Sequence, residues 1–109
     1  MLLREIKTNP QACCLDEIPE GKGRFGLDQS NPVPVFGIPS NEVYLKRLSI
    51  RGGGSIQWRR VHSIQDSIIE KSIDEYEIFD GNGDAITFIY ISPYHLKISN
   101  KAPEGFEIR

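Results

Sequence analysis

Cysteine is scarce in this chain: two of its 109 residues are cysteines, Cys13 and Cys14, and they are adjacent. Neighbouring cysteines do not readily adopt ordinary disulfide geometry, which places the two Cα atoms about 4.4–6.8 Å apart. No distant cysteine is present as another partner. We therefore expect two small apolar side chains in a reducing compartment, the cytoplasm, and a core that forms without disulfides.

Long apolar runs and a strong net charge are also missing. No run approaches the roughly 18 residues of a membrane span, and the N-terminus meets charge at Arg4, unlike a secretory signal peptide. A net charge of −2 and a pI near 5.7 argue against a general binder of nucleic acids or anionic membranes. With 39% hydrophobic residues, the chain suits one domain with a modest core, spanning 1–109.

Proline and glycine divide the chain into two parts. Five of the seven prolines lie in residues 1–40, and this density prevents long helices and central strands. Residues 1–40 are therefore predicted to be an irregular arm, in which Asn31–Val35 is extended because residues before proline favour β geometry. The β-rich core follows in 41–109, with strands expected at about 42–51, 55–63, 73–80 and 85–92.

Two glycine-containing turns connect these strands in pairs. Gly52–Gly54 joins the first pair, and Gly81–Gly83 joins the second with an Asn-Gly dipeptide, which takes the positive φ angles of a type I′ turn easily. The run Ala85–Ile91 is apolar on both faces and is predicted to be the most buried strand. The sequence thus predicts an α+β, mainly β fold: a four-stranded antiparallel meander, followed after Pro93 by a loop and a short strand.

Two segments of the predicted core, Ile64–Ser72 and 55–63, do not have the pattern of a simple buried strand. Ile64–Ser72 has an apolar spacing that fits one or two helical turns, and a long loop is the alternative. In 55–63, strict alternation places four side chains on one face: Ile56, Trp58, Arg60 and His62. Neither face of this strand is purely apolar, which favours a strand with one solvated side.

Charge changes sign once along the predicted core. The stretch Val43–Gln65 has no acidic residue, and its five bases are Lys46, Arg47, Arg51, Arg59 and Arg60. The stretch Asp66–Asp84 has one base, Lys71, and seven acids: Asp66, Glu70, Asp74, Glu75, Glu77, Asp80 and Asp84. Bases are expected on the first hairpin and acids on the second, which suits the binding of another macromolecule. The alternative is that the two sets pair across strands, at about 0.2–1 kcal/mol per pair.

The acidic set favours a protein partner with a basic cleft. A strand face rich in carboxylates mimics nucleic-acid phosphates and covers the active site of a nuclease, and complementary charge accelerates association towards about 10⁸–10⁹ M⁻¹s⁻¹. The residues predicted to bind this partner are Asp74, Glu75, Glu77, Asp80 and Asp84. Such a protein acts by occlusion, so we expect neither enzymatic activity nor a cofactor.

Two alternatives belong to other functional classes. Aromatic side chains between bases resemble the surfaces of RNA-binding sheets, and the residues concerned are Tyr44, Arg47, Arg51, Trp58 and Arg59. The low net charge makes a nucleic-acid partner the weaker hypothesis. A small ribonuclease would instead need the two histidines of the chain, His62 and His95, to converge in one cleft for general acid–base chemistry.

Two short motifs are predicted to be ordinary turns. Gly21–Gly26 matches the G-x-G-x-x-G string of dinucleotide sites, but neither a strand before it nor a helix after it is expected. Asp80–Asp84 spaces its oxygen ligands as a calcium-binding loop does, yet Ala85 and Ile91 occupy the positions that require glycine and glutamate. No metal site is therefore predicted.

From Asn31 onward, the chain resembles a group of small bacterial proteins. The resemblance covers about residues 31–109 and rests on these short segments: Asn31–Gly37, Val43–Leu45, Arg47-Leu48, Trp58–Val61, Ile73–Glu77, Tyr94-His95 and Ala102–Phe106. Small, acidic, cysteine-poor bacterial chains of this kind are often immunity partners of secreted toxins, including those of contact-dependent inhibition systems. The resemblance implies an immunity protein that binds a toxin domain, such as a nuclease, and covers its active site.

Overall fold

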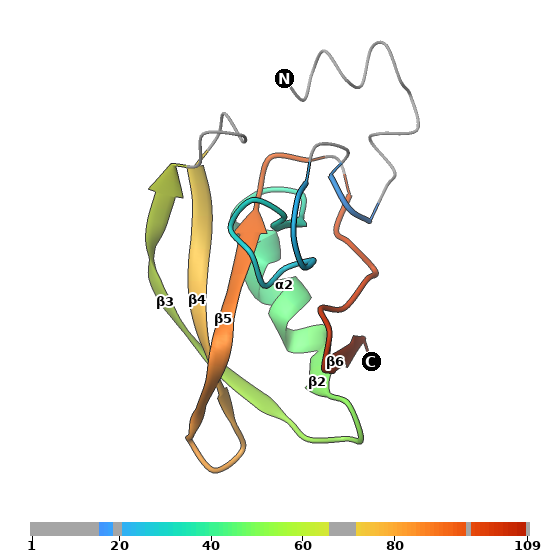
Figure 1. Cartoon of the computed structure of the whole chain (residues 1–109), viewed down its shortest axis with the longest axis vertical. Coiled ribbons are helices and arrows are strands. Elements are labelled where there is room, and N and C mark those ends of the chain that lie inside the picture. Colours follow the sequence, from blue (N-terminus) through green and yellow to red (C-terminus); the bar gives the residue numbers. More distant parts are fainter. Residues whose placement is uncertain (1–15, 19–20, 66–71, 96, 109) are drawn as a thin grey trace.

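The computed structural model describes residues 16–18, 21–65, 72–95 and 97–108. The predicted mainly β character is confirmed in this part of the chain (Figure 1). The elements are β1 (Val33–Pro34), α2 (Pro39–Arg47), β2 (Leu48–Ile50), β3 (Ile56–Gln65), β4 (Ser72–Asp80), β5 (Ala85–Ser92) and β6 (Phe106–Ile108). No helix among the described residues has the length and apolar character that crossing a membrane requires. The adjacent cysteines lie outside the described residues.

The larger sheet has four strands in the order β1-β5-β4-β3. Strands β3, β4 and β5 are antiparallel neighbours, whereas β1 lies parallel to β5, with Val33 opposite Ile91. The expected antiparallel meander is therefore wrong: its last three strands are present as β3, β4 and β5, but the remaining strand of the sheet is β1 and not the segment 42–51. The strand comes from the N-terminal arm, where proline is tolerated because it sits at the edge of the sheet and need not donate a ladder hydrogen bond.

The first expected strand, at 42–51, is helical up to Arg47 and forms β2 only afterwards. Pro39 stands in the first turn of α2, where its missing N–H is not needed. Glu42 in that turn and Lys46-Arg47 in the last turn complement the helix dipole. β2 then pairs with β6 in a separate two-stranded sheet, so the hairpin expected between β2 and β3 is wrong as well.

The hairpin expected at Gly81–Gly83 is confirmed, because β4 and β5 pair on either side of it. The expected type I′ turn is wrong, because Gly83 has a positive φ of 88° whereas Asn82 does not have a positive φ. In the turn, Asp80 Oδ1 accepts hydrogen bonds from the backbone N–H groups of Asn82 at 2.9 Å and Asp84 at 3.0 Å. The expected short strand after Pro93 is also confirmed and is β6. Local turn chemistry thus fixes the end of the sheet at which β4 and β5 meet.

Strand β3 extends to Gln65, so the ambiguous stretch Ile64–Ser72 begins as strand, and its residues 66–71 lie outside the described residues. A bulge between Arg60 and His62 interrupts the pairing of β3 with β4. The extra residue, Val61, reverses the alternation of side chains. His62 therefore lies on the opposite face from Arg60, and the expectation that they share a face is wrong.

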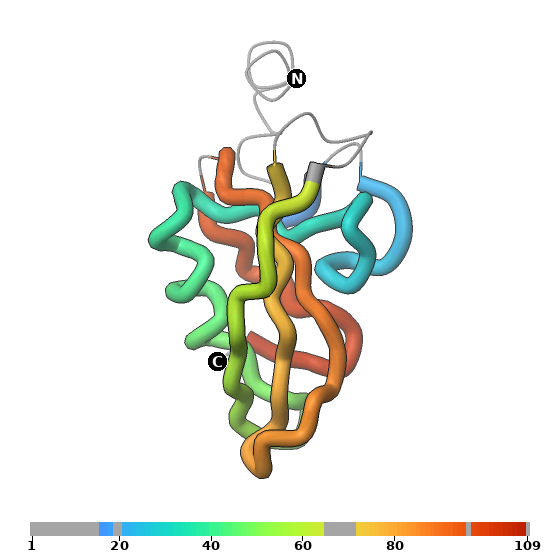
Figure 2. Tube along the Cα trace, turned by 90° about the vertical axis from the view of Figure 1, so that its left-hand side faces the viewer, coloured from blue at the N-terminus to red at the C-terminus, as the bar shows by residue number. Residues whose placement is uncertain are grey.

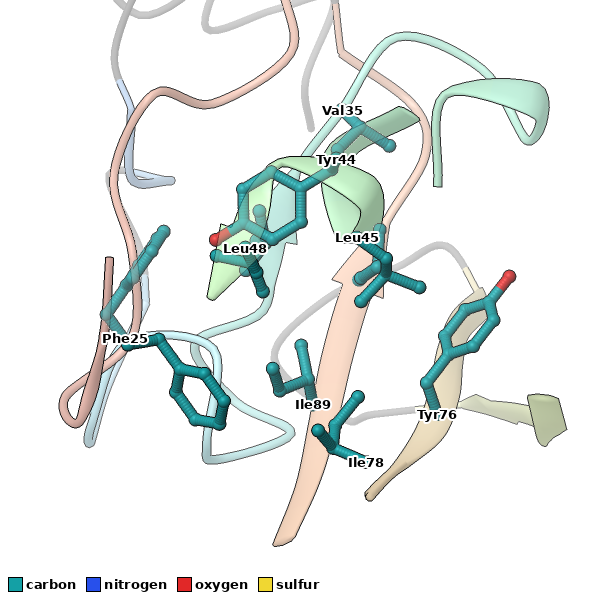
Figure 3. Packing of buried hydrophobic residues seen from close by; sticks show 11 residues of the cluster. Phe25, Val35, Tyr44, Leu45, Leu48, Tyr76, Ile78 and Ile89 are labelled. Carbon is teal, nitrogen blue, oxygen red and sulfur yellow. The ribbon is translucent and has the colours of Figure 1, made fainter. Parts of the chain in front are cut away.

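One face of the larger sheet carries the core. Tyr44 and Leu45 of α2 and Leu48 of β2 pack toward Ile78 and Ile89, and all five are fully buried (Figure 3). Tyr44, Leu45 and Leu48 follow the i, i+1, i+4 spacing of a helix face. Burial contributes about 1.5–3 kcal/mol per large apolar side chain, which outweighs the local preference of this segment for strand.

The other face of the sheet is open over much of its length. Figure 2 looks onto this face: β3, β4 and β5 run side by side in front, with α2 on their far side. Pairing places Arg59 of β3, Glu77 of β4 and Phe88 of β5 in one row across it. Near one end, Ile18 packs with Ile73 in a small second cluster. The open face therefore combines charged and apolar side chains.

Candidate functional site

Opposite charges meet across β3 and β4, although they are separate along the chain. The pairs are Arg59 with Glu77, Arg60 with Asp74 at 3.0 Å, and His62 with Glu75 at 3.4 Å. Three of the five acids predicted to bind a partner are therefore engaged by the neighbouring strand. The cross-strand pairing considered as the alternative for these charges is what the structure shows for them. Because Arg59 is largely exposed, its pair with Glu77 contributes at most about 1 kcal/mol.

Asp74 is the most buried of these acids, with 4% of its surface exposed. Its Oδ2 accepts a hydrogen bond from Asn41 Nδ2 at 2.7 Å, and its Oδ1 accepts from Arg60 Nη2 at 3.0 Å and Ser63 Oγ at 2.7 Å. These bonds offset the cost of removing the carboxylate from water. Asp74 thus links α2, β3 and β4, and its predicted place on a partner-binding surface is wrong.

Asp80 and Asp84 lie at the turn between β4 and β5. Asp84 is exposed and Asp80 is partly exposed. Over the described ranges, no basic side chain forms an ion pair with either carboxylate. The turn stands at one end of the larger sheet (Figure 1). It therefore forms an anionic tip whose charge is not compensated by the rest of the described fold.

Two exposed apolar side chains lie beside this tip on β5. Ile86 is 45% exposed and Phe88 is 40% exposed, whereas Ile89 and Ile91 are fully buried. The prediction that this strand is the most buried on both faces is therefore wrong for its first half. We call Asp80, Asp84, Ile86 and Phe88 together the hairpin surface. The exposure of Ile86 and Phe88 was not predicted from the sequence, because a run of apolar residues does not show which half of a strand is covered.

A groove of about 280 Å³ adjoins the hairpin surface. Its apolar lining comes from the loop before β1, from β2, from β5 and from β6, and consists of Leu27, Ile50, Ile86 and Phe106. Arg24 and Glu104 lie at the groove as an exposed charge pair, with Arg24 Nη1 and Glu104 Oε1 4.0 Å apart. Asp80 also lines it. The groove is thus apolar inside and mainly acidic at its borders.

The residues of the RNA-binding hypothesis do not form one surface. Tyr44 is fully buried, its hydroxyl donates to the carbonyl of Lys101 at 2.6 Å, and burial raises the pKa of this hydroxyl far above its usual value. Trp58 packs against the core, whereas its neighbour Arg59 lies on the open face. The remaining two, Arg47 and Arg51, lie in α2 and in the turn after β2. Base stacking needs exposed aromatic rings, and Tyr44 offers none.

The two histidines do not converge either. His62 lies on β3, one edge of the larger sheet, and is paired with Glu75. His95 lies beyond the opposite edge, where its backbone N–H donates to the carbonyl of Val35 at 3.1 Å. Three strand spacings of about 4.8 Å separate those edges, so the rings do not share one cleft. His95 Nε2 instead lies 3.0 Å from Ser92 Oγ, and burial lowers the pKa of His95 to about 4.

The site that remains is the hairpin surface with its adjoining groove. Among the residues that the structure describes, no group of three or more His, Cys, Asp or Glu side chains is arranged to hold a metal ion. Unpaired carboxylates beside exposed apolar side chains suit a partner whose surface is cationic and partly apolar. Comparison with known proteins identifies no relative, since no protein-family model, no curated protein and no solved structure matches the chain.

Proposed function

We propose that this protein is a bacterial immunity protein, which binds a cognate toxin domain in the cytoplasm and neutralises it by covering a basic active-site cleft. The hairpin surface is the observation that supports this proposal. It presents Asp80 and Asp84, which have no ion-pair partner among the described residues, beside the exposed side chains of Ile86 and Phe88. The partner is a protein, such as a nuclease domain, and no cofactor takes part.

The two kinds of side chain have different roles in such a complex. The carboxylates attract the basic cleft over a distance of about 10 Å at moderate salt, which raises the association rate. Phe88 and Ile86 lose water-exposed apolar surface on contact and so slow dissociation. Glu75 and Glu77 contribute less than expected from the sequence, because β3 already supplies them with partners, His62 for Glu75 and Arg59 for Glu77.

The proposal is tested by sequencing the neighbouring reading frames and expressing this protein together with the C-terminal domain of any large secreted protein that they encode. The wild type is expected to restore growth, and the double variant Asp80→Lys/Asp84→Lys is expected to bind the toxin domain at least tenfold more weakly. Glu42→Lys is the matched control, because Glu42 is an exposed acid at the distant end of the fold, in the first turn of α2.

Two outcomes would contradict the proposal. One is that the wild-type protein does not restore growth when it is expressed together with that toxin domain. The other is toxin affinity that is the same for Asp80→Lys/Asp84→Lys and Glu42→Lys, measured by titration calorimetry at low salt. The affinity of the wild type is also expected to fall as salt increases, and that of the double variant to be less sensitive to salt.

A further inference from the structure

Strand β5 is covered along one half of its outer edge and open along the other. Strand β1 reaches only Ile91 and Ser92, and the carbonyl of Gly26 accepts a hydrogen bond from the backbone N–H of Tyr90 at 2.9 Å. Within the described residues, no strand pairs with this edge between Ala85 and Phe88. We propose that this open half-edge, together with the adjoining groove, is a strand-addition site for an extended peptide segment of the partner protein.

Alternation along β5 identifies the backbone groups that are available. The N–H of Tyr90 and the carbonyl of Ser92, which accepts from Val35 N at 3.0 Å, both point to the outer edge. Groups two residues apart on a strand point to the same side, so the N–H and carbonyl of Phe88 point outward too. Thr87 Oγ1 lies 3.5 Å from the Phe88 carbonyl, which is too long to satisfy it. A polypeptide in extended conformation supplies the complementary donor and acceptor at the required spacing.

The side chains of this half-edge lack the usual protection against strand pairing. Natural edge strands carry charges, prolines, bulges or covering segments, and of these the half-edge has a bulge at Ile86, between the pairs Thr87–Ile78 and Ala85–Phe79. Residues 85–92 include no charged residue and no proline, and Ile86 and Phe88 are exposed. Unprotected edges of this kind pair with another chain. We therefore expect a partner segment to cover the edge in the functional state.

The groove and its charges define the chemistry of the segment. An added strand sends alternate side chains to opposite faces, so one set enters the groove lined by Leu27, Ile50 and Phe106. At about 280 Å³, the groove is smaller than a typical drug-sized pocket of about 300–1,000 Å³ and suits one large apolar side chain. Of the described residues that line the groove, Asp80 and Glu104 are acidic and Arg24 is basic, and Asp84 adds a further acid at the turn. The segment should therefore alternate apolar residues and carry lysine or arginine at the end that lies over the turn.

A second copy of this chain fits the edge less well. In an antiparallel pair of copies, the loop that holds Gly26 beside one strand would meet the Gly81–Gly83 turn of the other. A free segment has no such covering loop. The proposal builds on the proposed function, because the segment is taken to be part of the toxin domain, but its test does not require that domain.

The test uses the full chain and an end-blocked, fluorescein-labelled peptide of alternating valine and threonine with two lysines at one end, synthesised in both chain directions. Fluorescence anisotropy at low salt is expected to show saturable binding in one direction. Methylating alternate backbone nitrogens of that peptide is expected to weaken binding at least tenfold, because it removes the donors of the ladder. Replacing its lysines with glutamate is expected to weaken binding at least fivefold.

A protein variant and an exchange measurement locate the site. Phe88→Pro removes the outward N–H without removing a hydrogen bond to β4, and Phe88→Thr keeps that N–H while removing the ring. Phe88→Pro is expected to bind at least tenfold more weakly than Phe88→Thr. The amide hydrogen of Phe88 in the wild type is expected to exchange at least tenfold more slowly with saturating peptide. This measurement remains decisive if Phe88→Pro does not fold.

Four results would overturn the inference. Equal binding of the methylated and unmethylated peptides would show that the edge does not pair, as would unchanged exchange at Phe88. Concentration-dependent dimerisation that Phe88→Pro abolishes would assign the edge to a second copy. If the protein neutralises the toxin but binds no peptide, strand addition is overturned and the proposed function stands. If the protein binds the peptide but does not bind the toxin, the proposed function is overturned and strand addition stands.

Discussion

Asn41, in the first turn of α2, donates a hydrogen bond from Nδ2 to Oδ2 of Asp74 on β4 across 2.7 Å, and both side chains are buried. The same amide group lies 3.2 Å from the hydroxyl of Tyr76. The helix is thus joined to the sheet by polar contacts as well as by the apolar core. Because these groups are out of water, each one depends on the others for its hydrogen bonds.

Asp74→Ala is expected to lower the free energy of unfolding by about 3 kcal/mol, because it leaves buried donors without their acceptor. Asn41→Ala is expected to lower the free energy of unfolding by about 2 kcal/mol, because it leaves the buried Oδ2 of Asp74 without its donor. Urea unfolding followed by circular dichroism measures both. Glu42→Ala is the control, since its exposed side chain lies next to Asn41 and its removal should change stability by less than about 0.5 kcal/mol. A cost below 1 kcal/mol for Asp74→Ala would show that the network does not stabilise the fold.

Adjacent arginines on β3 offer a second comparison. Arg60 contacts the buried Asp74, whose side chain is 5% exposed, whereas Arg59 contacts Glu77, whose side chain is 20% exposed. Arg60→Met is expected to cost about 2 kcal/mol of unfolding free energy and Arg59→Met less than about 1 kcal/mol. Equal costs in parallel urea titrations would mean that burial of the carboxylate does not decide the strength of these pairs.

Stability should also depend on the protonation of His95. Burial lowers the pKa of His95 to about 4 in the folded protein, against about 6.5 in the unfolded chain. Between these values the unfolded chain binds more protons, so the free energy of unfolding falls as the pH is lowered from about 6.5 to about 4. The loss attributable to this group is at most about 3 kcal/mol.

His95→Gln keeps a polar partner for Ser92 and removes the titration. Urea unfolding at pH 7 and pH 4.5 should therefore show a smaller difference for His95→Gln than for the wild type. The same pH dependence in both proteins would assign the acid sensitivity to other groups. Asp16, whose pKa is lowered by the hydrogen bond from the Asn100 backbone, contributes chiefly below this range.

Gly26 is packed too closely to accept a side chain. Its φ is 72°, and a Cβ there would lie 2.8 Å from Pro103 Cγ and 3.0 Å from Val33 Cγ2. Gly105 has a similar φ of 90°, but nothing lies within 4 Å of the corresponding position. Gly105→Ala is expected to cost about 1 kcal/mol from backbone strain alone, and Gly26→Ala about 3 kcal/mol, since a clash is added. Equal melting temperatures for the two variants would contradict this packing argument.

The parts of the fold that the sequence predicts correctly are those with local causes. Gly83, with its positive φ, fixes the turn between β4 and β5, and the runs on either side of it pair with each other. Segment 42–51 is different, because Val43, Tyr44 and Leu45 are common in strands. The helical signals near this segment, Pro39 and Glu42, are weak. The burial of Tyr44 and Leu45 decides its structure, and that burial depends on a sheet formed by distant residues.

The candidate site is harder to predict for a related reason. Pairing of Arg60 with Asp74 requires the register of β3 against β4, and the bulge at Val61 sets that register without a recognisable local pattern. The exposure of Ile86 and Phe88 follows from how little of β5 the short strand β1 covers. A charge pattern along the chain shows which residues are available for pairing, but it does not show which of them face each other.

The small sheet of β2 and β6 pairs Ile50 with Phe106 and Leu48 with Ile108, residues that are far apart along the chain. During synthesis, Leu48 leaves the ribosome long before its partner strand has been made. The pair of β2 and β6 therefore cannot form until β3, β4 and β5, which lie between them in the chain, have been synthesised. Closure of the fold is thus one of the last events of translation for this domain, and its rate is set by how fast two distant segments find each other.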